Sequence, residues 1–127
     1  MTERSPTILI VEDEVPFRSV IAAYLEDCGF RMLHADNGQE GLAQMEQERA
    51  DVVLTDLRMP VMDGIDFIAR MRSSYPDTPI IIISGTTDMF FLDDATKLGV
   101  TAFFTKPIED MEKLVGAIEQ AIARTKE

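Results

Sequence analysis

Residues 52–64, VVLTDLRMPVMDG, begin as an apolar run and then reach a carboxylate, a proline and a glycine. The run VVL is typical of a strand that is buried on both faces, because no polar residue alternates with the apolar ones. Asp56 follows shortly after, so an ionisable side chain stands near the point where the strand should end. For a single aspartate, a helix cap or a solvated strand end is the ordinary explanation. Whether that explanation is sufficient depends on the residues around the other predicted strands.

Four more short apolar runs lie along the chain, and the patterns between them are helical. We expect strands at residues 7–11, 31–35, 52–55, 80–83 and 101–104. The first helix should follow the first strand, because apolar residues recur there at helical spacing. Those residues, which we expect on the buried face of the helix, are Phe17, Val20, Ile21, Tyr24 and Cys28.

The remaining helices are predicted from capping residues and from a second apolar stripe. Asn37, with Glu40 three residues later, predicts the start of one helix, and Asp63 or Gly64 opens the next. The stripe near the C-terminus consists of Met111, Leu114, Val115, Ile118 and Ile122. Strand and helix therefore alternate five times, which predicts an α/β fold with a doubly wound parallel sheet and helices on both faces. We expect a single domain over residues 1–127, with its core at about residues 6–125.

The acidic balance of the chain restricts its partners. Its 12 basic and 23 acidic residues give a formal net charge of −11, and no basic stripe offsets that charge. Nucleic acids repel such a surface, so we expect no direct nucleic-acid binding. No apolar run approaches the roughly 18 residues of a membrane span, and the single cysteine, Cys28, permits no internal disulfide. The composition therefore favours a cytoplasmic domain that does not enter a membrane.

Polar side chains stand where the predicted strands end. In doubly wound sheets, ligands bind beyond the carboxyl ends of the strands, at the point where the strand order reverses. If the order is 2-1-3-4-5, that point lies between the first and third strands, where Glu12, Asp13 and Asp56 would converge. Ser84 would lie on the neighbouring strand. Lys106 would lie one strand further, with a side chain long enough to reach back.

This predicted cluster of carboxylates has a chemical consequence. Crowded carboxylates repel one another and raise one another's pKa, so a bound cation would stabilise them. Oxygen ligands favour Mg²⁺, with Mn²⁺ as a substitute, over zinc, and His34 is the only histidine of the chain. A carboxylate beside Mg²⁺, a lysine and a hydroxyl can attack a phosphoryl group and carry it as an acyl phosphate. The residues therefore predict phosphoryl transfer to an aspartate.

Four motifs carry a resemblance to a known family: VEDE at 11–14, TDLRMPVMDG at 55–64, IIIIS at 80–84 and TKP at 105–107. In this order and at this spacing, they resemble the receiver domain of bacterial two-component response regulators. The resemblance covers nearly the whole chain and implies a flavodoxin-like, five-stranded parallel sheet in the order 2-1-3-4-5. It also implies that a sensor histidine kinase or a histidine phosphotransfer protein supplies the phosphoryl group.

The resemblance implies a role for each matching position of the metal site. Asp56 matches the phosphoacceptor. Asp13 matches the carboxylate that binds Mg²⁺ directly, and Glu12 matches its neighbour, which usually acts through water. The backbone carbonyl of Arg58 matches the group that completes the metal shell, so the side chain of that residue need not matter for binding.

The resemblance also implies how phosphorylation changes the domain. Ser84 matches the hydroxyl that turns toward the phosphoryl group, Lys106 the lysine that pairs with it, and Phe103 the aromatic switch residue. The Lys106–Pro107 bond is expected to be cis, a conformation largely confined to bonds that precede proline. The fourth helix, the fifth strand and the fifth helix should together form the surface that controls an effector or a homodimer.

The expected fourth helix, within residues 86–99, has more apolar side chains than one buried stripe can hold. Phe91, Ala95 and Leu98 lie at the spacing of such a stripe. Met89 and Phe90 do not fit it. They either tuck under the preceding loop or form part of an exposed apolar patch, which in soluble proteins often marks a docking surface.

Two other classes of protein share parts of this pattern. A Mg²⁺-dependent phosphatase of the haloacid-dehalogenase type also uses an aspartate nucleophile, but it normally has a second aspartate two residues later, where this chain has Arg58. A flavodoxin-like cofactor carrier needs a phosphate-binding loop after the first strand, where the acidic residues 12–14 would repel phosphate. We therefore expect a phosphoryl-accepting switch and not an enzyme. No output domain follows the last predicted helix, so we expect either a stand-alone receiver or the N-terminal part of a larger regulator.

Overall fold

Strands and helices alternate along the whole chain in the computed structural model, which describes residues 5–85 and 89–125. The strands are β1 Thr7–Val11, β2 Arg31–Ala35, β3 Val52–Thr55, β4 Ile80–Ser84 and β5 Ala102–Thr105. The helices are α1 Val15–Asp27, α2 Gly38–Gln47, α3 Gly64–Ser74, α4 Met89–Lys97 and α5 Met111–Thr125. Within the described ranges, no helix combines the length and the apolar character that crossing a membrane requires.

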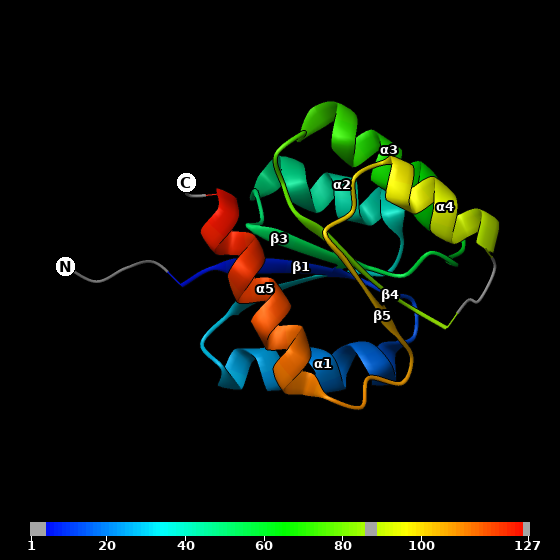
Figure 1. Ribbon diagram of the computed structural model, residues 1–127. Helices are drawn as coiled ribbons and strands as arrows, with labels where there is room; N and C mark the ends of the chain where they lie inside the picture. Colours follow the sequence, from blue (N-terminus) through cyan, green and yellow to red (C-terminus); the bar gives the residue numbers. More distant parts are fainter. Residues whose placement is uncertain (1–4, 86–88, 126–127) are drawn as a thin grey trace.

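The five strands form one parallel sheet in the order β2-β1-β3-β4-β5. Helices α1 and α5 cover one face of this sheet, and α2, α3 and α4 cover the other (Figure 1). The predicted fold class is therefore confirmed. Three strand boundaries differ by one residue from the prediction: β4 extends to Ser84, and β5 both starts and ends one residue later, at Ala102 and Thr105.

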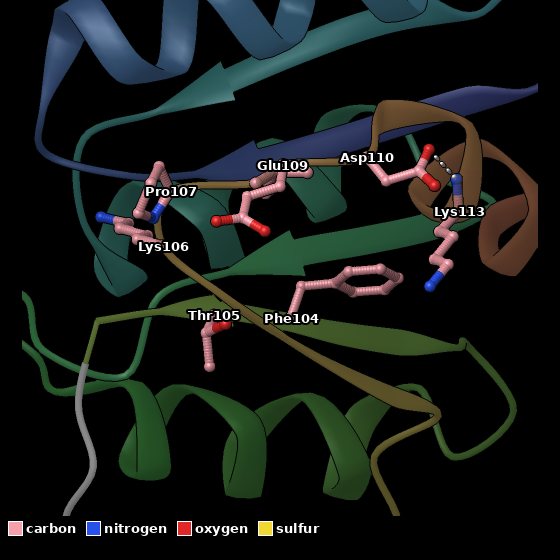
Figure 2. A pocket seen from close by; sticks show the side chains of 8 residues that line it. Phe104, Thr105, Lys106, Pro107, Glu109, Asp110 and Lys113 are labelled. Carbon is pink, nitrogen blue, oxygen red and sulfur yellow. Dashed lines mark hydrogen bonds between the residues drawn. The ribbon is translucent and has the colours of Figure 1, made fainter.

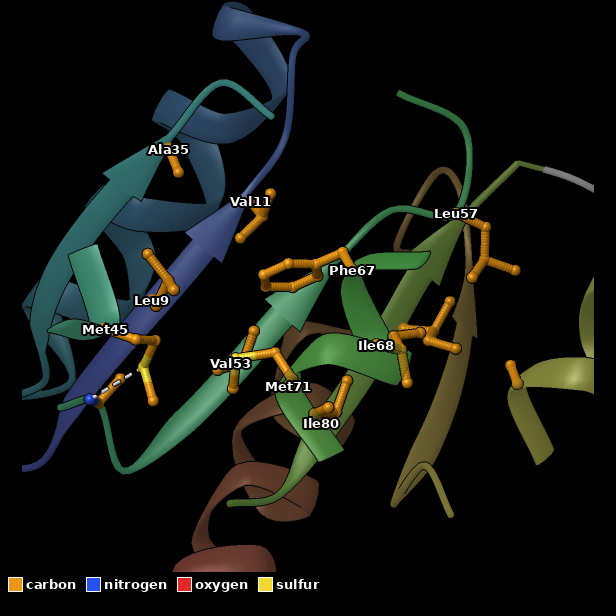
Figure 3. Close-up of a cluster of buried hydrophobic side chains, with 13 residues drawn as sticks. Leu9, Val11, Ala35, Met45, Val53, Leu57, Phe67, Ile68, Met71 and Ile80 are labelled. Carbon is orange, nitrogen blue, oxygen red and sulfur yellow. Dashed lines mark hydrogen bonds between the residues drawn. The ribbon is translucent and has the colours of Figure 1, made fainter. Parts of the chain in front are cut away.

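The core consists of two layers because neighbouring residues of a strand point to opposite faces of the sheet. Leu9 and Val11 pack under α2, α3 and α4 with Phe67, which fills the centre of that layer (Figure 3). Ile8 and Ile10 pack under α1 and α5. All residues of β1, β3 and β4 are buried, which confirms that these unbroken apolar runs are covered on both faces.

The predicted helix starts are confirmed by side-chain caps. The side chain of Asn37 accepts a hydrogen bond of 2.9 Å from the backbone N–H of Glu40, and Asp63 caps α3 by accepting one of 2.9 Å from Asp66. In α4, Ala95 is buried as the predicted stripe requires. The expectation for Met89 and Phe90 concerns side chains that lie outside the described part of the structure.

The prediction for the buried face of α1 is correct for Phe17 and Ile21 but wrong for Val20, Tyr24 and Cys28, which are exposed. The helix buries Ile21, Ala22 and Leu25, while the side chain of Val20 is 69% exposed. The inward face includes Arg18, whose guanidinium donates hydrogen bonds to the carbonyl oxygens of Glu12 and Ala35, at 2.9 and 3.3 Å, where β1 and β2 end. A prediction from hydropathy places no arginine on a buried face. It therefore assigns the buried face to the neighbouring stripe, which contains only apolar residues.

Candidate functional site

Three carboxylates meet at the carboxyl edge of the sheet. Glu12 and Asp13 directly follow β1, and Asp56 directly follows β3, which is the neighbour of β1 in the sheet. One carboxylate oxygen from each of the three residues lies within 4.8 Å of the others. Glu12 and Asp56 are buried, whereas Asp13 is exposed and faces the opening of the site. The cluster offers only oxygen ligands, which suit Mg²⁺ or Mn²⁺.

Lys106 lies at the centre of these charges. Its Nζ atom is 2.7 Å from Oε1 of Glu12, 2.7 Å from Oε1 of Glu14 and 2.8 Å from Oδ2 of Asp56. The ammonium group also lies 4.6 Å from the centre of the Phe17 ring. Burial alone would lower the pKa of Lys106, but hydrogen bonds to the three carboxylates outweigh it and raise that pKa above its ordinary value. The lysine therefore keeps its positive charge.

Glu12 is the most deeply buried acid of the cluster. Burial raises the pKa of its carboxyl group above the ordinary value. The hydrogen bond from Lys106 and one of 3.1 Å from the backbone N–H of Glu14 oppose this change by stabilising the carboxylate. The negative charge of Glu12 therefore depends on the partners that the start of α1 and the end of β5 supply.

The carboxylate of Asp56 has two differently held oxygen atoms. Oδ1 accepts hydrogen bonds from the backbone N–H groups of Leu57 and Arg58, at 2.6 and 3.2 Å. Oδ2 accepts from Lys106. With only 6% of the residue exposed, Asp56 lies at the base of the site in a fixed orientation. Such preorganisation suits a group that must attack an incoming substrate from one direction.

Gly64 permits the backbone behind Asp56 to fold this tightly. A Cβ atom at this position would lie 2.4 Å from the carbonyl oxygen of Asp56 and 2.5 Å from Cα of Leu57. The N–H of Gly64 donates a hydrogen bond of 2.8 Å to the carbonyl oxygen of Leu57. The motif TDLRMPVMDG, residues 55–64, therefore closes into a loop in which Gly64 packs against the backbone of Asp56.

An open cleft of about 290 Å³ leads from the surface to Asp56. Its lining residues are Asp13, Glu14, Asp56, Arg58, Ser84, Gly85 and Lys106. Ser84 ends β4, and its carbonyl oxygen accepts a hydrogen bond of 3.0 Å from the backbone N–H of Lys106. Phe103 does not line this cleft. It lies on β5, three residues before Lys106, and is 37% exposed.

The chain turns sharply after Lys106. The Lys106–Pro107 bond is cis, as expected. Figure 2 shows the loop that follows, in which the carboxylate of Asp110 lies beside Lys113 at the start of α5. This carboxylate accepts hydrogen bonds from the backbone N–H groups of Glu112 and Lys113, at 3.0 and 3.3 Å. A second hollow, of about 300 Å³, is lined by this loop. The loop thus anchors the lysine of the site to α5.

The sequence predicts that these polar residues converge, but it does not predict two of the contacts of Lys106. In the sequence, Glu14 belongs to an acidic motif and Phe17 to the apolar pattern of the first helix. Both stand at the start of α1, next to the cleft. An aromatic ring three residues after an acidic strand end is compatible with ordinary packing, so only the structure reveals its contact with the ammonium group.

A parallel sheet in this order, with an aspartate, two further acids and a lysine at its carboxyl edge, is the arrangement that the resemblance to receiver domains implies. Comparison with known proteins gives the family: residues 8–119 match the response regulator receiver domain, and the chain belongs to that family. A receiver domain from Clostridium thermocellum has a similar structure, with a TM-score of 0.88, 32% identity, and coverage of 95% of this chain and 97% of that one.

Two curated relatives place similar domains in longer proteins. Transcriptional regulatory protein GlrR of Escherichia coli is 31% identical over 125 residues, which make up 98% of this chain and 28% of GlrR. Autoinducer 1 sensor kinase/phosphatase LuxN of Vibrio harveyi is 36% identical over 98 residues, which make up 77% of this chain and 12% of LuxN. The chain thus spans little more than a quarter of one relative and a smaller share of the other.

Proposed function

We propose that Asp56 accepts a phosphoryl group from the phosphohistidine of a sensor histidine kinase or a histidine phosphotransfer protein. The observation that carries this proposal is the position of Asp56 at the base of the cleft, with Oδ2 bonded to Lys106 at 2.8 Å. Membership of the receiver domain family supports it, because such domains function as signalling partners of kinases. The domain acts as a phosphoryl carrier and switch, and not as an enzyme with turnover.

The transfer itself requires few groups. An oxygen of the Asp56 carboxylate forms a bond to phosphorus, and the bond between phosphorus and the donor's imidazole nitrogen breaks. The electron pair of that bond leaves with the imidazole. Lys106 pairs with a phosphoryl oxygen, and the backbone N–H groups of Leu57 and Arg58 hold the other carboxylate oxygen in place. The protein therefore contributes mainly position and charge, as phosphoryl transfer demands.

The donor set fits a divalent cation with oxygen ligands. Three carboxylates converge within 4.8 Å, and Lys106 pairs with two of them, those of Glu12 and Asp56. Asp13 and Asp56 would bind Mg²⁺ directly, Glu12 through water, and Arg58 through its backbone carbonyl, with Mn²⁺ as a substitute. When bound, the ion would neutralise charge on the phosphoryl oxygens. A zinc site is disfavoured because the donor set contains neither histidine nor cysteine.

Phosphorylation would change the surface of α4, β5 and α5. Ser84 and Lys106 line the cleft from the ends of β4 and β5, so both can contact a phosphoryl group on Asp56. Phe103 belongs to β5 and is 37% exposed, so its ring is not fixed by packing on all sides and can turn inward. This surface would then bind an effector, attached or separate, or a second copy of the domain. Light scattering with and without beryllofluoride and Mg²⁺ distinguishes the homodimer from the other two partners.

Labelling with acetyl phosphate in the presence of Mg²⁺, followed by mass spectrometry, tests the phosphoacceptor. We expect Asp56→Asn to abolish labelling, because asparagine keeps the shape of the side chain but is not a competent nucleophile. Asp66→Asn, which removes the same charge from the exposed first turn of α3, is the matched control and should keep full labelling. Undiminished labelling of Asp56→Asn, with the phosphate on another residue, would overturn the proposal.

A further inference from the structure

Glu14 is the partner of Lys106 that the proposed reaction does not use. Its Oε1 atom lies 2.7 Å from Nζ of Lys106, as close as that of Glu12. The two glutamates differ in burial, since 62% of the Glu14 side chain is exposed and only 2% of the Glu12 side chain. Glu14 also lines the cleft that leads to Asp56. A carboxylate therefore stands at the mouth of the cleft, on the path of an incoming donor.

The start of α1 does not explain this orientation. Glu14 occupies the N-cap position of α1, but its side chain makes no capping hydrogen bond. Capping side chains normally bond to the free N–H groups of the first turn and stabilise the helix in that way. The carboxylate instead extends across the cleft to the far side, where Lys106 follows β5. Its position is thus set by the site and not by the helix.

The charge at Glu14 acts on anything that enters the cleft. Three carboxylates contact the Lys106 ammonium group, those of Glu12, Glu14 and Asp56, and Asp13 lies beside Glu12 and Asp56. An anionic phosphodonor meets the exposed carboxylates of Asp13 and Glu14 first. Glu14 also pairs with Lys106, and this contact reduces the positive charge that Lys106 offers to a phosphoryl oxygen. Repulsion between charges a few ångströms apart in a partly exposed cleft changes rates by about threefold to tenfold.

We propose that Glu14 is an electrostatic gate on the phosphoacceptor cleft: it positions Lys106 and slows phosphorylation by small anionic donors. This inference rests on the proposed function of Asp56. A protein donor overcomes the gate because its own contacts with the domain supply binding energy, whereas a small anion has only its phosphoryl group. Glu14 is a positioning and selectivity residue, since it touches Lys106 and not the reacting atoms.

The rate of Asp56 labelling by acetyl phosphate at saturating Mg²⁺ and low salt tests the gate. In this reaction, the Asp56 oxygen bonds to phosphorus, and the phosphorus–oxygen bond to the acetyl group breaks, with acetate leaving with the electron pair. We expect Glu14→Gln to accelerate labelling by about threefold to tenfold. Glu26→Gln is the matched control. It makes the same change on the same helix, about 18 Å away at 1.5 Å per residue, and should keep the wild-type rate.

Four further readouts separate charge from fold. The acceleration should be larger for dianionic acetyl phosphate than for monoanionic phosphoramidate, and high salt should reduce it. Glu14→Asp keeps the negative charge at the mouth of the cleft, so it should repel anionic donors as the wild type does and stay close to the wild-type rate. Thermal melting of the three variants should resemble that of the wild type, because the side chain of Glu14 is largely exposed.

Equal rates for Glu14→Gln and the wild type would overturn the gate, as would the same acceleration in Glu26→Gln or in Glu14→Asp. These results differ from a failure of the proposed function. If the wild type itself takes no label on Asp56, the phosphoacceptor assignment fails. If the wild type is labelled on Asp56 and Glu14→Gln is no faster, only the gate fails.

Discussion

The Nζ atom of Lys106 lies 2.8 Å from Oδ2 of Asp56, although 50 residues separate the two in the sequence and β4 lies between the strands that they follow. The same ammonium group neutralises Glu12, which is almost fully buried. In the absence of Mg²⁺, Lys106 is thus the cation that holds the two buried carboxylates together. A divalent ion bound at the same carboxylates would compete with it for their charge.

Lys106→Met should therefore change stability and Mg²⁺ affinity in opposite directions. With a chelator present, we expect a loss of about 2 kcal/mol in the free energy of unfolding, because Glu12 and Asp56 lose their partner inside the protein. Removal of the positive charge should raise Mg²⁺ affinity by about tenfold. Thermal melting across a Mg²⁺ titration measures both, since binding to the native state alone stabilises it. Lys113→Met, an exposed lysine of α5, should change neither quantity appreciably, and equal effects in the two variants would contradict the prediction.

The strand–helix alternation predicted the fold because each local signal agreed with the global architecture. An apolar run such as IIII at 80–83 is buried completely only if both faces of its strand are covered. A parallel sheet with helices on both sides covers both faces. Once the sheet is parallel, the residues that follow the strands must share one edge. Asp56 and Lys106 could therefore be placed together without any knowledge of the distance between them.

Three features of the structure are not predicted from the sequence: the buried face of α1, the contact between Glu14 and Lys106, and the backbone conformation of Val61. Two apolar stripes run along α1, and burial of Arg18 against two carbonyl groups decides between them in a way that hydropathy cannot weigh. The contact between Glu14 and Lys106 requires the relative placement of α1 and β5, which no local pattern encodes. A strong strand former such as valine also gives no warning that the backbone at Val61 has a positive φ.

Gly64 is expected to tolerate no side chain. The Cβ of alanine would meet the backbone of Asp56 and Leu57, which cannot move without shifting the phosphoacceptor. We expect Gly64→Ala to lower the free energy of unfolding by about 3 kcal/mol. Gly116→Ala provides the control in α5, where nothing lies within 4 Å of the added atom, and it should stabilise the protein by about 0.5 kcal/mol. Chemical denaturation of both variants measures the difference, and a loss in both or in neither would refute this account.

Val61 occupies a strained turn in the loop between β3 and α3. Its φ is 72°, and the N–H of Met62 donates a hydrogen bond of 2.8 Å to the carbonyl oxygen of Pro60, two residues earlier. A γ-turn with positive φ is rare and unfavourable, above all for a β-branched residue. The side chain is 75% exposed, so its removal sacrifices little burial.

Val61→Gly should therefore stabilise the protein, by about 1 kcal/mol, because glycine adopts positive φ without a steric cost. The same change at Val20, an exposed residue in the middle of α1, should destabilise it by about 0.5 kcal/mol, since helical φ gives glycine no advantage there. Urea unfolding of the two variants gives both signs directly. If Val61→Gly proves as destabilising as Val20→Gly, the turn holds no strain.

Thr7 and Thr55 are both buried threonines on neighbouring strands, but their hydroxyl groups differ. Thr55 donates a hydrogen bond of 2.9 Å to the carbonyl oxygen of Asp56. Within the described residues, the hydroxyl of Thr7 is the one buried side-chain polar atom with no hydrogen-bond partner. A buried hydroxyl without a partner costs stability, whereas a bonded one contributes to it.

Replacement by valine, which has nearly the same shape, should therefore have opposite effects at the two positions. We expect Thr7→Val to raise the free energy of unfolding by about 1 kcal/mol, because the unsatisfied hydroxyl is replaced by a methyl group. Thr55→Val should lower it by about 1 kcal/mol, since the carbonyl of Asp56 loses a donor. Melting temperatures and urea midpoints of the two variants test this directly. Destabilisation by Thr7→Val would mean that its hydroxyl is bonded in solution, for instance to a buried water molecule.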